Sequence, residues 1–246
     1  MAHGSTSDSD RAVLLAALAD ELSQPRSEES TARAVTHRAL DHVSDADCVS
    51  ITLRAGQDRF FTVGATDDLS ERLDHLQYEL GEGPCVEAAD GHDWYRSGEV
   101  GVDPRWPRWG PRAHQLGAGS LLSVRLVSGG SSIGALNFYS LAEGRFDDRE
   151  ELDFAVVYST HVAIALANIR ELSGLETAIH NRHLIGVAQG ILIERFGLDL
   201  PGAFDVLRRY SSSTNTKLAQ VAEEVVRTGR LPDLVRAHGT NGDDRT

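Results

Sequence analysis

Two cysteines are the side chains of this sequence with the most direct chemical potential. Cys85 follows the turn Gly81–Pro84 and begins a short predicted helix, and a thiol at a helix N-terminus has a lowered pKa in principle. That position would permit redox sensing, but Glu82 and Glu87 nearby disfavour the thiolate. We therefore interpret Cys85 as a small packed residue. Cys48 begins a predicted strand, and we expect it to be structural.

The sequence otherwise lacks the patterns of catalytic and metal sites. It contains no phosphate-cradling loop with Lys, no Ser elbow, and no nucleophile with a base at a recognisable spacing. Two cysteines are too few for a disulfide framework, and scattered histidines such as His37 and His161 show no spacing typical of a metal site. We expect no enzyme activity, no metal and no cofactor.

Charge is distributed unevenly along the chain. The 246 residues carry a net charge of −13, which disfavours non-specific binding to nucleic acid. Residues 1–177 hold 15 Arg against 29 acidic residues, whereas residues 178–236 hold eight basic against six acidic residues. The second part is therefore net positive. Such an asymmetry indicates different roles for the two parts, although it does not by itself identify nucleic acid.

Composition also bears on the compartment of the protein. Hydrophobic residues make up 41% of the chain, enough for a sizeable core. No run approaches the roughly 18 apolar residues of a membrane span, and Met1–Ser5 lacks the basic start of a signal peptide. Together with the low cysteine content, these features predict a cytoplasmic protein with no membrane contact.

Hydrophobic periodicity predicts an α+β fold for the first two thirds of the chain. Residues 1–10 are polar and predicted to be disordered, a helical pattern follows, and Ser30 or Thr31 could cap a second helix. Strands are predicted at residues 49–54, 59–63, 120–127 and 133–140, and helices at 13–22 and 66–80. This mixture favours an antiparallel sheet with flanking helices. The tryptophan-rich loop 91–117 is either functional or a lid packed over the sheet.

A helix of about 50 residues is predicted next, with Asp147 as its N-cap and Gly197 as its C-cap. Its apolar residues recur at three- and four-residue steps, interrupted only by Gly174. A helix of this length usually links two domains or pairs with a second copy. Because it carries more apolar side chains than one domain could cover, we predict a homodimer through residues 147–197, with Leu166 and Ile169 in the contact.

Two shorter helices are predicted beyond Gly197. Pro201 suits the first turn of one helix, and Ser211–Asn215 ends it and supplies the N-cap of the next. With the end of the long helix they would form a three-helix bundle of about 50 residues. The residues expected to form its core are Phe204, Leu207, Leu218 and Val221.

Residues 174–232 closely resemble the ANTAR family, whose domains are three-helix RNA-binding antiterminator modules. The resemblance lies in four segments that occur in the expected order, residues 185–192, 203–204, 207–211 and 215–222. Two positions depart from the family pattern. Gln189 stands where many members have Lys, and Thr216 stands where they have a second basic residue. Each departure removes a possible phosphate contact.

Residues 30–170 resemble the GAF sensor family, in the form that is joined to ANTAR domains in actinobacteria. The segments that carry this resemblance are Tyr78–Cys85, Asp103–Pro107 and Gly134–Tyr139. GAF domains bind varied small molecules or none detectable. The resemblance therefore implies a sensory role and leaves the small-molecule ligand unidentified.

A set of surface side chains in the ANTAR-like segment is suited to RNA. RNA loops offer phosphates to Arg and splayed bases to amide side chains. A solvated surface would explain any one of these residues, but the whole set on a net-positive module favours RNA contact. The predicted RNA-binding residues are Arg182, Gln189, Arg208, Arg209, Asn215 and Lys217.

The sequence thus predicts a disordered start and N-terminal helix (residues 1–29), a GAF-like sensor domain (30–173), an ANTAR-like three-helix RNA-binding domain (174–236) and a disordered tail (237–246). By resemblance, the protein would be a transcriptional regulator that stabilises hairpins in nascent transcripts and prevents termination. Two alternatives stay open. One is a ligand- or redox-sensing module whose helical tail only mediates dimerisation, and the other is a DNA-binding regulator, because three short helices can mimic a helix-turn-helix.

Overall fold

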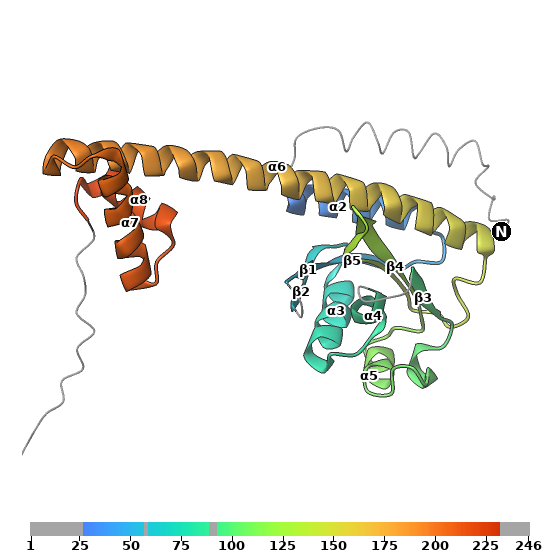
Figure 1. The fold of residues 1–246 in the computed structure, drawn as a ribbon. Coiled ribbons are helices and arrows are strands. Elements are labelled where there is room, and N and C mark those ends of the chain that lie inside the picture. Colours follow the sequence, from blue (N-terminus) through green and yellow to red (C-terminus); the bar gives the residue numbers. More distant parts are fainter. Residues whose placement is uncertain (1–26, 57–58, 89–92, 232–246) are drawn as a thin grey trace, which may run out of the picture. The chain divides into compact units, whose positions relative to one another are not determined.

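The computed structural model describes residues 27–56, 59–88 and 93–231. The predicted disorder of residues 1–10, the predicted helix at 13–22 and the predicted tail 237–246 lie outside these ranges. The chain divides into two compact units, Met1–Glu171 and Leu172–Thr246. We call the first the sheet domain and the second the helical domain, and each is described by itself (Figure 1).

The sheet domain is built on one five-stranded antiparallel sheet in the order β2-β1-β5-β4-β3. The strands are β1 (Cys48–Ala55), β2 (Arg59–Ala65), β3 (Trp94–Ser97), β4 (Ser120–Ser128) and β5 (Ser131–Ser140). Strands β1 and β2 form one antiparallel hairpin, strands β4 and β5 form another, and the pairing of β5 with β1 brings both hairpins into one sheet. The predicted α+β fold with an antiparallel sheet is confirmed.

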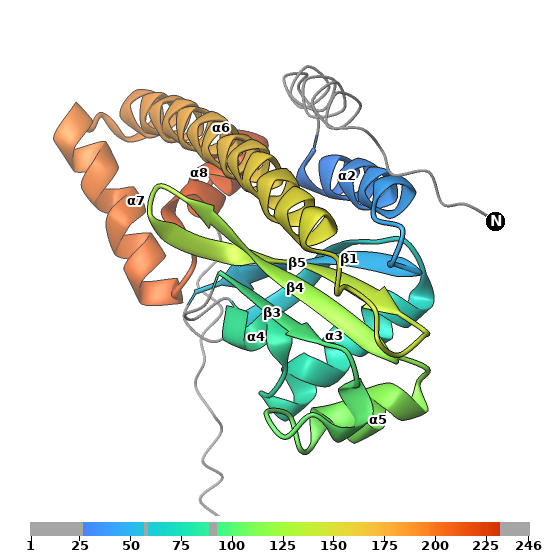
Figure 2. The same ribbon diagram turned by 90° about the vertical axis from the view of Figure 1, so that its right-hand side faces the viewer.

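Helices cover both faces of this sheet (Figure 2). One face packs against α2 (Glu28–His42) and the first part of α6 (Arg149–Phe196), and the other lies under α3 (Asp68–Leu80), α4 (Pro84–Ala88) and α5 (Trp109–Gln115). A 3₁₀ turn, η1 (Val100–Val102), precedes α5. The alternation of apolar and polar residues at 49–54 predicts a strand with one buried face and one face in water. That prediction is wrong for most of β1, because helices cover both faces of the sheet and Cys48–Leu53 are all buried.

The face toward α2 and α6 is aliphatic. Val49, Ile51 and Leu53 of β1 are fully buried there, in one cluster with Tyr158 and Leu166 of α6. Leu166 therefore belongs to the core of the sheet domain. It is not available for the dimer contact that the sequence predicted, because its side chain is already covered within one chain.

The tryptophan-rich loop packs beneath the sheet. Trp106 and Trp109 are fully buried and their rings meet edge to face. The Trp109 indole donates a hydrogen bond to the Leu73 carbonyl at 3.2 Å, and the Trp106 indole donates to Glu87 at 2.9 Å. The lid interpretation of this loop is thus correct for two tryptophans, whereas Trp94 is 42% exposed.

Helix α6 begins with a different cap from the predicted one. The Asp148 carboxylate, and not that of Asp147, accepts a hydrogen bond from the N–H of Glu150, at 2.8 Å. Asp147 instead pairs with Arg96 of β3. The buried Glu151 accepts a hydrogen bond from the Ser44 hydroxyl at 2.8 Å. The first turn of α6 is therefore fixed to the sheet domain by charged groups.

Helix α6 is long and apolar enough to cross a membrane by length and composition, contrary to the expectation from the sequence. It is the single helix of this kind in the described ranges, and 44% of its apolar window is buried inside the structure. The buried part is the portion that packs against the sheet, where Tyr158, Val162 and Leu166 are completely covered. Packing in the core of the sheet domain accounts for the buried part of this apolar stretch.

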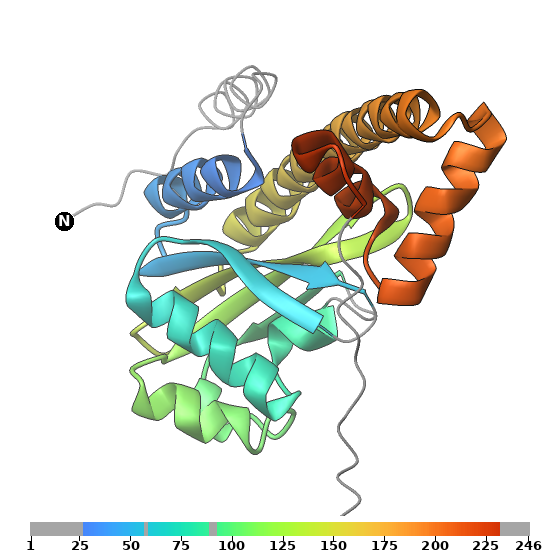
Figure 3. The ribbon, with the colours of Figure 1, turned by 90° about the vertical axis from the view of Figure 1, so that its left-hand side faces the viewer.

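The helical domain contains the end of α6, α7 (Leu200–Thr214) and α8 (Leu218–Thr228) (Figure 3). Gly197, in the left-handed conformation, follows the end of α6, and Asp199 caps α7 by accepting from the Gly202 N–H at 2.9 Å. The small bundle predicted from the sequence is present. Its fully buried core comprises Ala188, Leu192, Ala203, Leu207, Val221, Ala222 and Val225.

Candidate functional site

Buried polar side chains line the sheet face under α3 and α4. The strand register places Asn137 of β5 opposite both Ser50 of β1 and Ser123 of β4. Ser123 donates a hydrogen bond to the Asn137 amide oxygen at 2.7 Å, and the Asn137 amide donates to Ser50 at 3.3 Å. All three side chains are at most 1% exposed. Polar groups that are buried this completely need partners, and here they supply partners to one another.

Asp74 of α3 lies at the centre of this arrangement and is fully buried. Its carboxylate accepts hydrogen bonds from the Tyr139 hydroxyl at 2.7 Å, from the Asn137 amide at 3.0 Å and from the Thr62 hydroxyl at 3.0 Å. Burial raises the pKa of Asp74 to about 6, although these hydrogen bonds act in the opposite direction. The carboxyl group therefore changes its protonation close to neutral pH.

Tyr78 extends the network toward the edge of the sheet. Its hydroxyl lies 2.7 Å from the Thr52 hydroxyl and 3.0 Å from the Thr62 hydroxyl, and burial raises its pKa. We call the whole set the polar cluster. It comprises Ser50, Thr52, Thr62, Asp74, Gln77, Tyr78, Ser123, Asn137 and Tyr139.

Gln77 links the polar cluster to α4. Its side-chain amide donates to the Tyr139 hydroxyl at 2.9 Å and its amide oxygen accepts from the Cys85 N–H at 2.8 Å. Gly83 is needed for this contact, because its φ is 143° and a Cβ there would come within 2.4 Å of the Gln77 amide oxygen. The glycine-rich turn is thus shaped to seat α4 on Gln77.

Cys85 has none of the properties of a reactive cysteine. Its side chain is fully buried, and burial raises the pKa of its thiol well above the usual range. Burial also raises the pKa of Cys48. Both cysteines are unpaired. The interpretation of both residues as packed and structural is consistent with these positions, because a thiol without solvent access forms little thiolate.

Glu82 connects the glycine-rich turn to the tryptophan-rich loop. Its carboxylate accepts from the backbone N–H groups of Arg108 and Trp109 at 2.7 and 2.8 Å and from the Arg108 guanidinium at 2.9 Å. Although desolvation opposes the shift, these bonds lower the pKa of Glu82. Glu82 therefore joins one segment of the GAF resemblance, Tyr78–Cys85, to the two residues that directly follow another, Asp103–Pro107.

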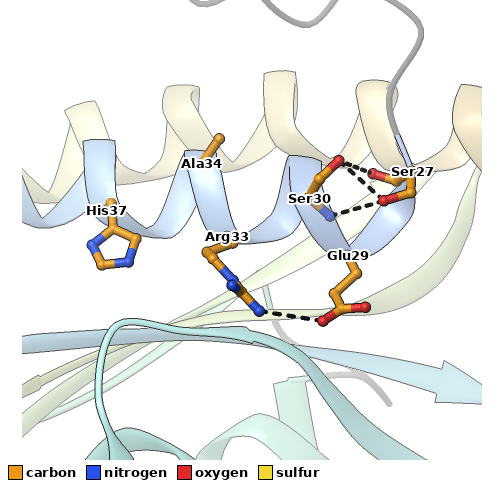
Figure 4. Close-up of a pocket in the computed structure, with 6 residues that line it drawn as sticks. All are labelled: Ser27, Glu29, Ser30, Arg33, Ala34 and His37. Atoms are coloured by element: carbon orange, nitrogen blue, oxygen red, sulfur yellow. Dashed lines mark hydrogen bonds and ion pairs between the residues drawn. The ribbon is translucent and has the colours of Figure 1, made fainter.

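Two cavities on the described part of the sheet domain lie apart from the polar cluster. A cavity of about 440 Å³ beside α2 is lined by one helical segment, in which Arg33 pairs with Glu29 at 3.2 Å and Ser27 caps the helix by accepting a hydrogen bond from the Ser30 N–H at 3.2 Å (Figure 4). A cavity of about 510 Å³ adjoins β3 and η1. No residue of the polar cluster lines either of these two cavities. Within the polar cluster Thr62 and Tyr78 are half-buried and the other seven side chains are buried, and the members supply hydrogen-bond partners to one another.

The predicted RNA-binding residues all lie in the helical domain. Arg182, Arg208, Arg209, Asn215 and Lys217 are exposed, and Gln189 is half-buried. The Gln189 amide donates to the Leu200 carbonyl at 3.2 Å, so this side chain holds the first turn of α7 to α6. Arg208 pairs with Asp205 at 2.9 Å. No hydrogen bond or ion pair holds the Arg182, Arg209 and Lys217 side chains to any residue in the described ranges.

The structure brings only part of this set together. Arg182 and Gln189 share one flank of α6, as predicted, because they are seven residues apart. Arg208 and Arg209 point about 100° apart around α7. Asn215, in the left-handed conformation, ends α7, and Lys217 immediately precedes α8. The connection between α7 and α8 therefore presents two of the predicted residues, Asn215 and Lys217, separated by one residue in the sequence.

Phe204 is the core prediction for this domain that the structure contradicts. Its side chain is 38% exposed and is absent from the packed cluster. The inward face of α7 is instead formed by Ala203 and Leu207, both completely buried. The spacing of three residues between Phe204 and Leu207 is compatible with both side chains facing the core of the bundle. In the structure Ala203 faces that core together with Leu207, and Phe204 does not.

Histidine, cysteine and carboxylate side chains do not gather into a metal-binding group anywhere in the described ranges. Three acidic side chains with shifted pKa values, Asp74, Glu82 and Asp103, all form hydrogen bonds within the protein. The pKa of Asp103 is lowered to about 2, because hydrogen bonds from Arg105 outweigh the effect of desolvation.

Comparison with known families matches both parts of the chain. The GAF domain family matches residues 25–167, more than half of the sequence, and the ANTAR domain family matches residues 173–226. A comparison with curated proteins gave no match. The two matched ranges meet close to the boundary between the sheet domain and the helical domain.

Solved structures of low sequence identity share the fold of the sheet domain. A GAF domain from a phosphoenolpyruvate-protein phosphotransferase of Coxiella burnetii has a TM-score of 0.55 at 17% identity, covering 69% of this chain and 99% of that one. The corresponding domain from Acinetobacter gives 0.53 at 14% identity, covering 69% and 99%. A free methionine-R-sulfoxide reductase from Neisseria meningitidis gives 0.53 at 16% identity, covering 70% and 98%. At these identities the likeness extends to the fold alone.

Proposed function

The chain belongs to the GAF family and also carries an ANTAR domain, and from this premise we propose that it is a cytoplasmic regulator of transcription antitermination. A regulatory sensor joined to an RNA-binding output domain is what the two families support. In the proposed function, the output domain binds hairpins in nascent transcripts and stabilises them against formation of a terminator.

The observation that carries this proposal is the set of unengaged cations on the ANTAR domain. Arg182, Arg209 and Lys217 are exposed on a module that is net positive within an acidic protein. Exposed cations without protein partners can neutralise phosphates at little cost, because they break no ion pair to do so. Neighbouring amide groups such as Asn215 suit the unpaired bases of RNA loops.

RNA binding is tested with the full-length chain. We expect tighter binding to a hairpin RNA than to a DNA duplex of equal charge, and a loss of salt dependence when Arg209 and Lys217 are both replaced by Ala. Arg227→Ala is the matched control, because Arg227 is an exposed cation of the same domain that is already paired with Glu224 at 2.6 Å. Equal affinities and equal salt slopes for RNA and DNA would favour the DNA-binding alternative.

Antitermination itself is tested by transcription in vitro. On a template with two hairpins before a terminator, added protein should increase read-through, and the Arg209→Ala, Lys217→Ala double variant should increase it less. Unchanged read-through with tight RNA binding would contradict antitermination and leave RNA binding intact.

We further propose that the protein is a homodimer through the middle of α6. All residues from 171 to 180 are exposed, among them Leu172, Leu175 and Ile179 at 60%, 54% and 70%. Their spacing of three and four residues forms one stripe, as in paired helices. Covering each such side chain would contribute about 1.5–3 kcal/mol.

The dimer is tested by light scattering of Leu175→Glu. The variant should have the mass of one chain at micromolar concentration, whereas the wild type should have the mass of two. A dimer would also place two RNA-binding domains on one particle and increase the affinity for paired hairpins through avidity. A wild-type protein with the mass of one chain would contradict the proposal.

For the sheet domain we propose sensing without catalysis. The polar cluster offers a mostly buried, directional network on which a small molecule or a proton could act, and Asp74 is its titrating member. Redox sensing is disfavoured because both cysteines are buried. Binding of a small molecule is tested by thermal shift in a panel of polar metabolites, with Asp74→Asn as the variant that should lose any response.

A further inference from the structure

Three large apolar side chains are exposed where α6 ends and α7 begins. Phe196 is 58% exposed, Leu200 is 61% exposed and Phe204 is 38% exposed. None of the three belongs to the packed cluster of the helical domain. Leu200 and Phe204 lie one turn apart on one flank of α7, and Phe196 precedes Leu200 by four residues, across the turn at Gly197. We call these three residues the end patch, because exposed apolar residues that occur together mark contact surfaces.

The end patch is separate from the apolar stripe on the middle of α6. Phe196 follows Ile179 by almost five helical turns, which is about 25 Å along the helix axis. A contact confined to the stripe therefore leaves the end patch in water. The end patch is also small for a dimer, since a stable interface between two proteins takes about 20–30 residues from each side. A short segment with one or two apolar side chains matches its size better.

The described part of the chain ends close to the end patch. Helix α8 ends at Thr228 and is followed by Gly229, which has the left-handed conformation. The Arg195 guanidinium donates a hydrogen bond to the Gly229 carbonyl, so the end of α8 lies beside the end of α6 (Figure 3). Arg195 directly precedes Phe196, and Leu231 packs against the buried cluster of the bundle. The residues after Leu231 therefore start next to the end of α6.

The segment that follows Leu231 has side chains suited to cover the end patch. Leu234 and Val235 stand three and four residues after Leu231, the spacing that places side chains on one face of a helical turn. Pro232 suits the first turn of such a helix. An extended chain spans about 3.3 Å per residue, so Leu234 can lie up to about 10 Å from Leu231. This is the distance between the axes of two packed helices, and Leu234 is thus within reach of the end patch.

We propose that residues 232–236 fold back and dock on the end patch of their own chain, with Leu234 and Val235 against Phe196 and Leu200. A tethered segment has an advantage over a separate partner, because a short linker gives it an effective concentration in the millimolar range. Its apolar side chains leave water together with the end patch, which stabilises the docked arrangement. The inference does not depend on RNA binding. It assigns a partner to a surface that the three helices of the bundle leave open.

Disulfide trapping in the full-length chain tests this docking. The native Cys48 and Cys85 are buried, so introduced cysteines are the ones that react. Phe196→Cys combined with Leu234→Cys should form a disulfide within one chain under mild oxidation, because docking brings the two Cβ atoms close to the roughly 4 Å that a disulfide needs. Glu194→Cys combined with Leu234→Cys is the matched control. Glu194 is exposed on the same last turn of α6 but points about 200° away from Phe196 around the helix, and this pair should react about tenfold more slowly.

Three outcomes of the trapping experiment would overturn the proposal. Equal rates for the two pairs would mean that the segment is not docked, because an undocked segment reaches both positions alike. A disulfide between two chains, recognised by a doubled mass without reductant, would assign the end patch to a second copy. No disulfide in either pair would show that Leu234 does not approach the end of α6.

A second measurement leaves the end patch itself unchanged. Leu234→Ser combined with Val235→Ser should uncover the end patch and increase the fluorescence of an added apolar dye about twofold. Thr240→Ser combined with Asn241→Ser alters the same terminal segment without removing an apolar contact, and it should leave the dye fluorescence at the wild-type level. Unchanged fluorescence in the Leu234→Ser, Val235→Ser variant would also overturn the docking.

Discussion

The two faces of the sheet are equally well buried but are held together differently. Toward α2 and α6, β1 presents Val49, Ile51 and Leu53 to aliphatic partners. Toward α3, the alternate residues Ser50 and Thr52 take part in a hydrogen-bonded network. Apolar packing has no preferred direction, whereas each member of the polar cluster needs a partner at a defined angle and distance.

This difference indicates how the sheet domain can respond to a signal. A small displacement of α3 changes apolar contacts gradually, but it breaks the hydrogen bonds of the fully buried Asp74 at once. Buried polar groups that lose their partners are costly. We therefore expect the polar face to be the responsive one, and the apolar face to hold α6 firmly as it leaves the domain.

The largest effect should come from a charge placed on the apolar face. Leu166→Glu should destabilise the sheet domain by about 4–5 kcal/mol or prevent folding, because an unpaired carboxylate would replace a fully buried side chain. Denaturant unfolding measures the change. Val157→Glu introduces the same charge on the same helix, at a side chain that is 44% exposed and lies outside the stripe at residues 172–179, and it should change stability by less than about 0.5 kcal/mol. Similar losses in both variants would contradict the assignment of Leu166 to this core.

The next effect is a dependence of stability on pH that originates on the polar face. The pKa of Asp74 is raised from 3.8 to about 6 in the folded state, so the folded protein holds this proton more tightly than the unfolded chain. The contribution of this group is favourable below pH 4 and is lost as pH rises through 6. Relative to Asp74→Asn, the wild type should therefore lose about 2 kcal/mol between pH 4 and pH 7.

The measurement is the difference in unfolding free energy between the two proteins at several pH values. If the wild type instead gains stability relative to Asp74→Asn as the pH rises, the prediction is wrong, and the buried carboxyl group is already charged at pH 4.

A smaller effect compares one tyrosine hydroxyl on each face. The Tyr139 hydroxyl donates to Asp74 and accepts from Gln77, so Tyr139→Phe should cost about 2–3 kcal/mol by leaving both groups short of a partner. The Tyr158 hydroxyl donates to the Val35 carbonyl at 2.7 Å. Tyr158→Phe should cost about 1 kcal/mol. Equal costs would mean that the two faces are not held differently.

The smallest expected effect is that the two cysteine thiols do not react in the folded protein. Cys48 and Cys85, the two cysteines of the chain, lie on the polar face and are buried. Neither should react with an aromatic disulfide reagent in the folded protein, and both should react once the protein is unfolded in denaturant. Fast labelling of Cys85 under native conditions would reopen the redox alternative.

Much of the architecture could be predicted from local patterns. Alternation along residues 49–54 and 133–140 identified strands, and the leucine spacing that ends at Gly81 identified α3, because helices and strands impose periods that a sequence displays directly. The long helix and the bundle after Gly197 were predicted for the same reason. The family resemblances depended on motifs of this local kind.

The candidate site could be predicted only in part. The exposed cations of the ANTAR domain were identified because exposure follows from charge. The polar cluster was missed, although Ser50 and Thr52 alternate with the apolar residues Val49, Ile51 and Leu53 of the same strand. That pattern also describes a strand with one face in water, and only the covering by α3 distinguishes the two cases.

The sequence by itself determined the elements, their order and the two families, since these depend on short-range periodicity and motifs. The tertiary structure decided which faces are covered. It placed Leu166 in a core and Phe204 at the surface, and it surrounded Asp74 with three donors from β2 and β5. The physical reason is that burial and hydrogen-bond partners arise from residues far apart in the chain, so the same side chain can be core, interface or solvent-facing without any local change.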